Sequence, residues 1–115
     1  MAGLWFEDFS EGMAFEHATR RTVTTYDHMH FSLMTMNPQP LHIDHEFAAQ
    51  SEWGQPLVNS LFTLGLLIGM TVGDTTEGTT LGNLGMTDVR FPHPVFEGDT
   101  LHARTRVIGV RASKS

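Results

Sequence analysis

The 115-residue sequence contains no cysteine, which excludes a fold held together by disulfide bonds. It also has no low-complexity run, no visible repeat and no linker-like stretch. Together with a hydrophobic content of 40%, these absences predict one globular domain spanning residues 1–115. Because no thiol needs protection or pairing, we expect the domain to work in a reducing or redox-indifferent compartment.

Secretory and membrane segments are also absent from the printed sequence. The first eight residues, MAGLWFED, have neither the basic region nor the apolar core of a signal peptide. The longest apolar stretch, Leu61 to Val72, is too short to span a bilayer. The sequence therefore predicts a cytoplasmic protein without a membrane partner.

Basic residues are few, with 7 Lys and Arg against 13 Asp and Glu and a formal charge of -6. Since they are scattered along the chain, the pattern argues against a general nucleic-acid binder. A small phosphate-bearing ligand remains compatible with this charge, because a few arginines and backbone amides can hold it. The arginines available for that role are Arg20, Arg21, Arg90, Arg104 and Arg106, although each taken singly is explained more simply as a solvated strand residue.

The pattern of apolar and turn-forming residues predicts short elements in the first half of the chain. A strand end covers Arg20 to Thr24, and Thr25 is expected to cap a helix that runs to about Met36. Asp44 has the character of an N-cap for a short helix from about His45 to Gln50.

The segment Leu57 to Val72 is predicted to be the central helix, with Asn59 and Ser60 capping its start. Its residues are apolar on every face, which is typical of a helix surrounded by protein. Gly65 and Gly69 share one helix face, where the missing side chains would let a strand backbone approach closely. A cofactor groove on that face is the weaker alternative.

Strand-like runs dominate the rest of the chain. In the last run, Leu101, Ala103, Thr105 and Val107 alternate with basic residues, as expected of a half-buried strand. The predicted strands are 79–84, 86–91 and 101–110. With the strand end at Arg20 to Thr24, this makes four predicted strands, which are few for one fully apolar helix. We therefore expect the sequence to be the front part of a longer domain whose C-terminal strands follow Ser115.

The most informative segment is the turn Asn37-Pro38-Gln39-Pro40-Leu41-His42-Ile43-Asp44. Its two prolines restrict their own φ angles and the residues before them, so polar groups are held in place by the backbone. His42 leaves this stiff turn between two apolar residues, and histidine is the side chain most often used for proton transfer. The simpler alternatives are an ordinary turn and a structural histidine, and we favour catalysis for His42.

Three features together resemble the MaoC-like hydratases and dehydratases of the hot-dog fold: the central helix, the turn N-x-Q-P-L-H-x-D, and the later run V-R-F-P-H-P-V-F-E-G-D-T. The resemblance implies an α+β fold in which an antiparallel sheet wraps around a long apolar helix, and a homodimer or larger assembly. It implies an enzyme that reversibly adds water to a 2-enoyl-CoA thioester, with coenzyme A as part of the substrate and no other cofactor or metal.

The family turn usually reads D-x-N-P-x-H-x-D, so Asn37 stands at the position of the catalytic aspartate and Gln39 replaces an asparagine. Asn37 cannot ionise, so it can only orient water or substrate, and His42 must then accept the proton. The N–H of Ser60 is our first choice for binding the developing negative charge on the thioester oxygen. Gln39, Asn59, Ser60 and Arg90 complete the expected substrate-binding set.

The turn and the run L-V-N-S-L-F-T-L-G are similar to a branch acting on short branched or dicarboxylic acyl groups, such as mesaconyl-CoA and methylmalyl-CoA. Two alternatives stay open: a non-catalytic acyl-CoA-binding or regulatory domain, which the loss of the aspartate would permit, and an acyl-CoA thioesterase. A metal site ranks last, because His28 and His30 point to different helix faces and no histidine pair has i, i+4 spacing.

Overall fold

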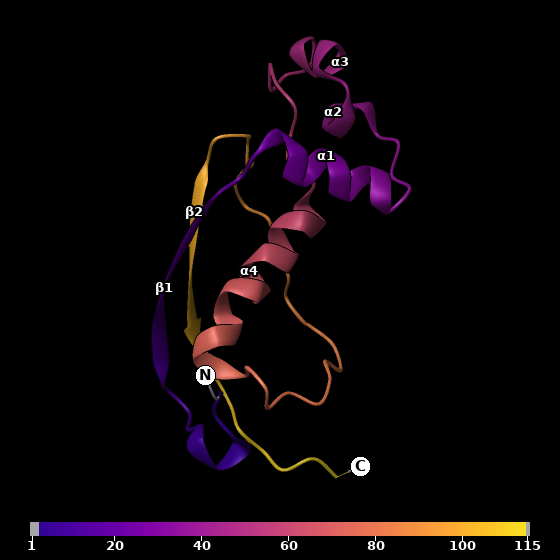
Figure 1. Ribbon diagram of the computed structural model, residues 1–115. Helices are drawn as coiled ribbons and strands as arrows, with labels where there is room; N and C mark the ends of the chain where they lie inside the picture. The colour runs from indigo at the N-terminus through magenta and orange to yellow at the C-terminus, as the bar shows by residue number, and fades with distance from the viewer. Residues whose placement is uncertain (1–2, 115) are drawn as a thin grey trace.

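The computed structural model describes residues 3–114, in which a long helix lies against a two-stranded antiparallel sheet (Figure 1). Strands β1 (Ala14–Thr22) and β2 (Thr100–Arg106) pair from Ala14 opposite Arg106 to Thr22 opposite Thr100, with an irregularity between Glu16 and Arg20. The helix, α4 (Ser60–Thr75), packs against both strands. The expected α+β arrangement is confirmed.

Three further α-helices lie beyond the N-terminal end of α4: α1 (Thr25–Met34), α2 (Pro40–Ile43) and α3 (His45–Ala49) (Figure 1). A short 3-10 helix, η1 (Phe6–Asp8), precedes β1. Asp44 is the N-cap of α3, as predicted, and its side chain accepts a hydrogen bond from the Phe47 amide at 3.0 Å. This end of the molecule carries the proline-rich turn.

The start of α1 lies one residue earlier than expected. Thr24, with extended backbone angles, is the N-cap, and its hydroxyl accepts a hydrogen bond from the amide of Asp27. In return, the Asp27 carboxylate accepts from the Thr24 amide at 2.8 Å. The prediction that Thr25 caps this helix was wrong, because the reciprocal capping box selects the threonine three residues before the aspartate.

Side chains on β2 alternate as the sequence predicted. Ala103 is buried, Leu101 and Thr105 are half-buried, and the residues between them are exposed. The small core consists of Val23, Ala48, Val58, Met70 and Ala103. Of the predicted strand end at Arg20 to Thr24, residues 20–22 belong to a longer strand that begins at Ala14, whereas Val23 and Thr24 lie beyond its end at Thr22.

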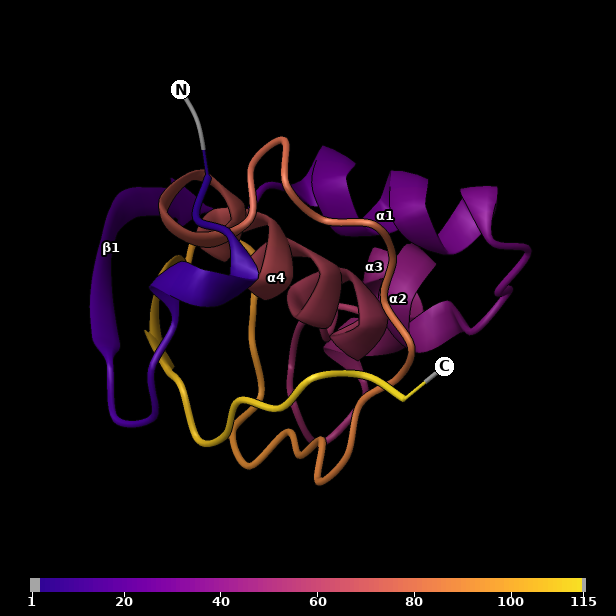
Figure 2. The same cartoon turned by 90° about the horizontal axis from the view of Figure 1, so that it is seen from below.

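The predicted strands at 79–84 and 86–91 were wrong. Residues 80–91 contain no strand, and the segment from 76 to 99 follows an irregular path around α4 before it reaches β2 (Figure 2). Leu81 and Leu84 are almost fully exposed. A strand needs a neighbour for its backbone N–H and C=O groups, and within residues 3–114 no other segment pairs with residues 79–91 in this way.

The helix α4 is also more open than its sequence suggested. Leu61, Leu67 and Ile68 are 60%, 41% and 38% exposed, so the described part of the chain covers only one side of the helix. A Cβ atom on Gly65 or Gly69 would meet nothing within 4 Å. Within residues 3–114, the prediction that a strand backbone approaches these glycines closely was therefore wrong. None of the helices in residues 3–114 has the length and apolar character needed to cross a membrane.

Candidate active site

The proline-rich turn between α1 and α3 includes the short helix α2. The Asn37 amide donates to the Ser32 carbonyl oxygen at 2.8 Å, and the Asn37 side-chain oxygen accepts from the Gln39 amide at 3.0 Å. Pro40 then occupies the first position of α2. The sequence analysis did not foresee this helix, although proline is well suited to a first helical position because it needs no N–H partner there.

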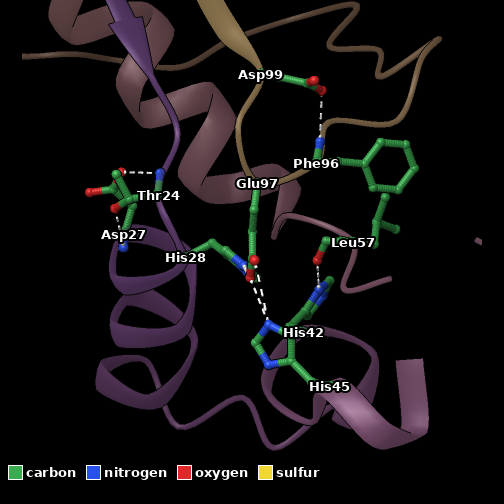
Figure 3. Close-up of polar contacts among 9 residues, drawn as sticks. All are labelled: Thr24, Asp27, His28, His42, His45, Leu57, Phe96, Glu97 and Asp99. Carbon is green, nitrogen blue, oxygen red and sulfur yellow. Dashed lines mark hydrogen bonds and ion pairs between the residues drawn. The ribbon is translucent and has the colours of Figure 1, made fainter. Parts of the chain in front are cut away.

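His42 lies on α2, and its imidazole ring is held through one ring nitrogen. Its Nδ1 atom lies 2.6 Å from the backbone carbonyl oxygen of Leu57 (Figure 3). A carbonyl oxygen only accepts hydrogen bonds, so Nδ1 must carry the proton and donate it. In the neutral ring, Nε2 is then the atom with the free lone pair. Nε2 can therefore accept a proton.

Leu57 makes a second contact with α2, because its backbone amide donates to the Leu41 carbonyl oxygen at 3.2 Å. Leu57 also forms an antiparallel bridge with Phe96, and the Val58 amide donates to Val95 at 2.9 Å. Residues 57 and 58 therefore fix both α2 and the loop that precedes β2.

A cavity of about 310 Å³ opens beside His42. Polar groups in its wall come from three places: α2, the first turn of α4, and the loop before β2. The lining residues are His42, Trp53, Leu57, Val58, Ser60, Thr63, Phe91, Pro92, His93, Pro94 and Val95. A mostly apolar cavity with a few convergent polar groups is the usual form of a small-molecule site.

Ser60 is the first residue of α4 and lines this cavity. Within the described residues its backbone N–H has no hydrogen-bond partner, whereas the Leu61 amide donates to the Asn59 side chain at 3.0 Å. Unpaired N–H groups at a helix N-terminus, together with the positive end of the helix dipole, favour a negatively charged oxygen. The Ser60 amide is thus available for such a ligand atom.

The Asn59 side chain makes hydrogen bonds that hold the fold together. It is buried, caps α4 with its side-chain oxygen, and donates from Nδ2 to the Ser32 hydroxyl at 3.1 Å. These contacts join α4 to α1. Any part that Asn59 plays in binding substrate would therefore be indirect, through the position of Ser60.

The other expected site residues lie apart from this cavity. Asn37 and Gln39 do not line it, and the Gln39 side chain is exposed. Arg90 lines a second, larger cavity of about 930 Å³ along α4. The two cavities share four residues, namely Thr63, Phe91, Pro92 and His93, so they adjoin.

A carboxylate joins the helices around the site. Glu97 Oε1 lies 2.8 Å from Nε2 of the buried His28, and the Glu97 carboxylate lies 3.4 Å from Nε2 of His45 (Figure 3). Burial alone would raise the pKa of Glu97, but hydrogen bonds from His28, Thr25 and His45 outweigh it and hold the pKa below its ordinary value. Glu97 thus fixes α1 and α3 to the loop before β2.

His28 is buried while His30 is exposed, so these two histidines do face different ways as predicted. Within residues 3–114, no group of three or more acidic or histidine side chains is placed to hold a metal ion. His93 and Thr63 are site residues that the sequence analysis did not place in the cavity. The sequence signal for His93 is its position between Pro92 and Pro94. His42 likewise lies near a proline, two residues after Pro40.

Comparisons with known proteins match nearly the whole chain. The family model described as MaoC like domain matches residues 8–115. Mesaconyl-CoA hydratase of Cereibacter sphaeroides is 32% identical over 99% of this chain and 33% of its own length. Beta-methylmalyl-CoA dehydratase of Chloroflexus aurantiacus is 33% identical over 97% of this chain and 32% of its own length. The chain therefore spans about a third of the length of these two curated relatives.

A solved structure has the same arrangement. It is the monoamine oxidase regulatory protein from Archaeoglobus fulgius, with a TM-score of 0.81 and 32% identity, and the match covers 95% of this chain and 73% of that one. The likeness confirms the expected hot-dog fold, of which this chain contributes a long helix and two paired strands.

Proposed function

Because the chain belongs to the MaoC-like domain family, we propose that it catalyses the reversible addition of water to a 2-enoyl-CoA thioester. One observation carries the proposal: His42 donates Nδ1–H to the Leu57 carbonyl and so leaves Nε2 as a base in a cavity that also contains the Ser60 amide. A base and an oxyanion-binding donor are the two groups that this reaction needs first.

In the proposed reaction, Nε2 of His42 takes a proton from a water molecule as the water oxygen attacks the β-carbon of the enoyl group. Electrons move toward the thioester oxygen, where the Ser60 N–H and the N-terminal end of α4 stabilise the negative charge. A proton must then reach the α-carbon, and His42 alone could return it only if no second acid takes part. Asn37 acts in this scheme through the turn that carries His42, because its side-chain oxygen accepts from the Gln39 backbone amide, and it does not titrate.

We further propose that the acyl group is short and branched or carries a second carboxylate. Support comes from the printed activities of the two curated relatives, mesaconyl-CoA hydratase and beta-methylmalyl-CoA dehydratase. It also comes from Arg90, which lines the cavity adjoining the His42 cavity and offers a positive charge for a carboxylate. We expect the active form to be a homodimer or larger assembly, without a cofactor beyond the coenzyme A of the substrate.

A non-catalytic acyl-CoA-binding or regulatory role is the second candidate. It is favoured by Asn37, which supplies no carboxylate to the turn, and by the likeness to a structure described as a regulatory protein. A thioesterase would use the same amide at the start of α4 with water placed at the thioester carbon.

Absorbance separates these functions, because a conjugated enoyl thioester loses its near-ultraviolet band when water adds to the double bond. We expect loss of this band with at least one of crotonyl-CoA, mesaconyl-CoA and itaconyl-CoA. Release of free coenzyme A, followed with a thiol reagent, would indicate a thioesterase. Binding across the panel, without loss of the band or release of thiol, would identify a binding domain.

A further inference from the structure

We propose that His93 is a second proton-transfer residue and supplies the proton that the α-carbon receives during hydration. This inference rests on the proposed hydratase function. It addresses the position where the family turn carries an aspartate and this chain carries Asn37, an amide that cannot donate or accept a proton at working pH.

The cavity beside His42 supports this role. Among its lining residues, His42 and His93 are the two histidines, and they come from different parts of the chain. His42 lies on α2, whereas His93 lies in the loop before β2. Substrate bound in the cavity would therefore lie beside two imidazoles, one from α2 and one from the loop before β2.

Both histidines are positioned by the same short segment. Leu57 accepts the hydrogen bond from His42, and residues 57 and 58 hold the loop of His93 through the Leu57–Phe96 bridge and the Val58 to Val95 hydrogen bond of 2.9 Å. Pro92 and Pro94 restrict the backbone on either side of His93. Residues 57 and 58 thus connect the helix of His42 to the loop of His93.

His93 is also free to exchange protons. Its side chain is exposed, and neither ring nitrogen has a hydrogen-bond partner among residues 3–114. The ionisable groups that share its surroundings are His42 in the first cavity and Asp88, Arg90 and His102 in the second. None of these is bonded to His93, so water can restore its protonation after each turnover.

The proposed step balances as follows. The water oxygen forms a bond to the β-carbon and gives its proton to Nε2 of His42, and the enolate α-carbon then takes a proton from the imidazolium of His93. His42 ends protonated and His93 neutral, and exchange with solvent returns both to their starting states. Hydration by this route needs neutral His42 and protonated His93.

The pH dependence of turnover tests the proposal, with whichever enoyl-CoA the parent protein hydrates. The parent should lose activity toward acid, as His42 is protonated, and toward alkali, as His93 is deprotonated. In His93→Gln we expect turnover to fall by about 10²-fold and the alkaline limb to disappear. His30→Gln, which changes an exposed histidine of α1 outside both cavities, should keep the parent profile.

Chemical rescue provides a second measurement if His93→Gln is too slow for a pH profile. His93→Ala at an exposed position should fold normally, and added imidazole should restore part of its turnover as a free proton donor. Retention of the alkaline limb in His93→Gln, or no rescue of His93→Ala by imidazole, would overturn the role of His93 even though the parent is a hydratase. A parent inactive on every enoyl-CoA tested would instead refute the proposed function, and this inference with it.

Discussion

The backbone carbonyl of Leu57 lies 2.6 Å from Nδ1 of His42 and accepts its proton in a hydrogen bond, so Nε2 of the neutral ring keeps the free lone pair. The two residues are fifteen positions apart in the sequence, and no helix or strand contains both. Fixing one ring nitrogen by a hydrogen bond sets the tautomer of the other. The proposed chemistry therefore depends on a main-chain atom as much as on the imidazole.

His42→Asn tests this relationship, because the asparagine amide can still donate to the Leu57 carbonyl but offers no base. We expect turnover to fall by about 10²–10⁴-fold, the usual contribution of a placed proton-transfer group, with little change in melting temperature. His30→Gln serves as the control for loss of a histidine. Near-normal turnover in a folded His42→Asn protein would refute the assignment of His42 as the base.

Ser60→Pro tests the oxyanion role of the Ser60 amide. Proline removes the N–H, yet it is tolerated at the first position of a helix, and Asn59 already has φ -58° and ψ 121°, a conformation allowed before proline. Turnover should fall by about 10²–10³-fold while the protein stays folded. Ser60→Ala, which keeps the amide and loses only the hydroxyl, should remain close to the parent, and equal losses in the two variants would contradict the proposal.

Asn37 is expected to influence turnover through the turn that carries His42, without titrating, because its side-chain oxygen accepts from the Gln39 backbone amide. Asn37→Ala should lower turnover without moving the limbs of the pH profile, because no ionisation is removed. Asn37→Asp should steepen the existing fall in turnover toward acid, since protonation of the new carboxylate would weaken its hydrogen bond from the Gln39 backbone amide. A shifted profile in Asn37→Ala would show that this amide influences the ionisation of a catalytic group.

Arg90 is expected to select substrates with a second carboxylate. In Arg90→Gln, kcat/KM for mesaconyl-CoA should fall by about 10-fold or more, since a hydrogen bond to a charged group is worth about 1.5–3 kcal/mol. The value for crotonyl-CoA, which has no such carboxylate, should change little. Equal losses with both substrates would remove the carboxylate assignment while leaving the hydratase function intact.

Glu97 is expected to stabilise the fold around the site in a pH-dependent way. Its pKa is below the ordinary value in the folded state, so its stabilising effect is complete above the unfolded pKa of a glutamate and is lost as pH falls through the folded pKa. At neutral pH, Glu97→Gln should lower the free energy of unfolding by about 1–3 kcal/mol, because His28 is buried and loses a charged partner.

Denaturant titrations across pH measure this effect, and the difference between the parent and Glu97→Gln should shrink toward acid. Glu16→Gln is the matched control, since Glu16 lies 3.4 Å from Arg104 with both side chains largely exposed. Its stability should stay close to the parent at every pH. A Glu97→Gln deficit that persists unchanged at acid pH would indicate a packing effect.

The sequence alone determined the features that depend on neighbouring residues. The caps at Asp44 and Asn59, the alternation along β2 and the family turn could all be predicted, because each follows from local hydrogen bonding or from a fixed side-chain period. The proline restraints on its turn also led to the proposal that His42 is the base, which stays a prediction.

Contacts between distant segments were decided only by the tertiary structure. The sequence could not show that Leu57 fixes the His42 tautomer, that residues 57 and 58 hold the loop of His93, or that Asn59 bonds to Ser32. The mistaken strands at 79–84 and 86–91 have the same origin. A run of residues can favour extended backbone, but it becomes a strand only where another segment pairs with its N–H and C=O groups, and that pairing is a property of the whole fold.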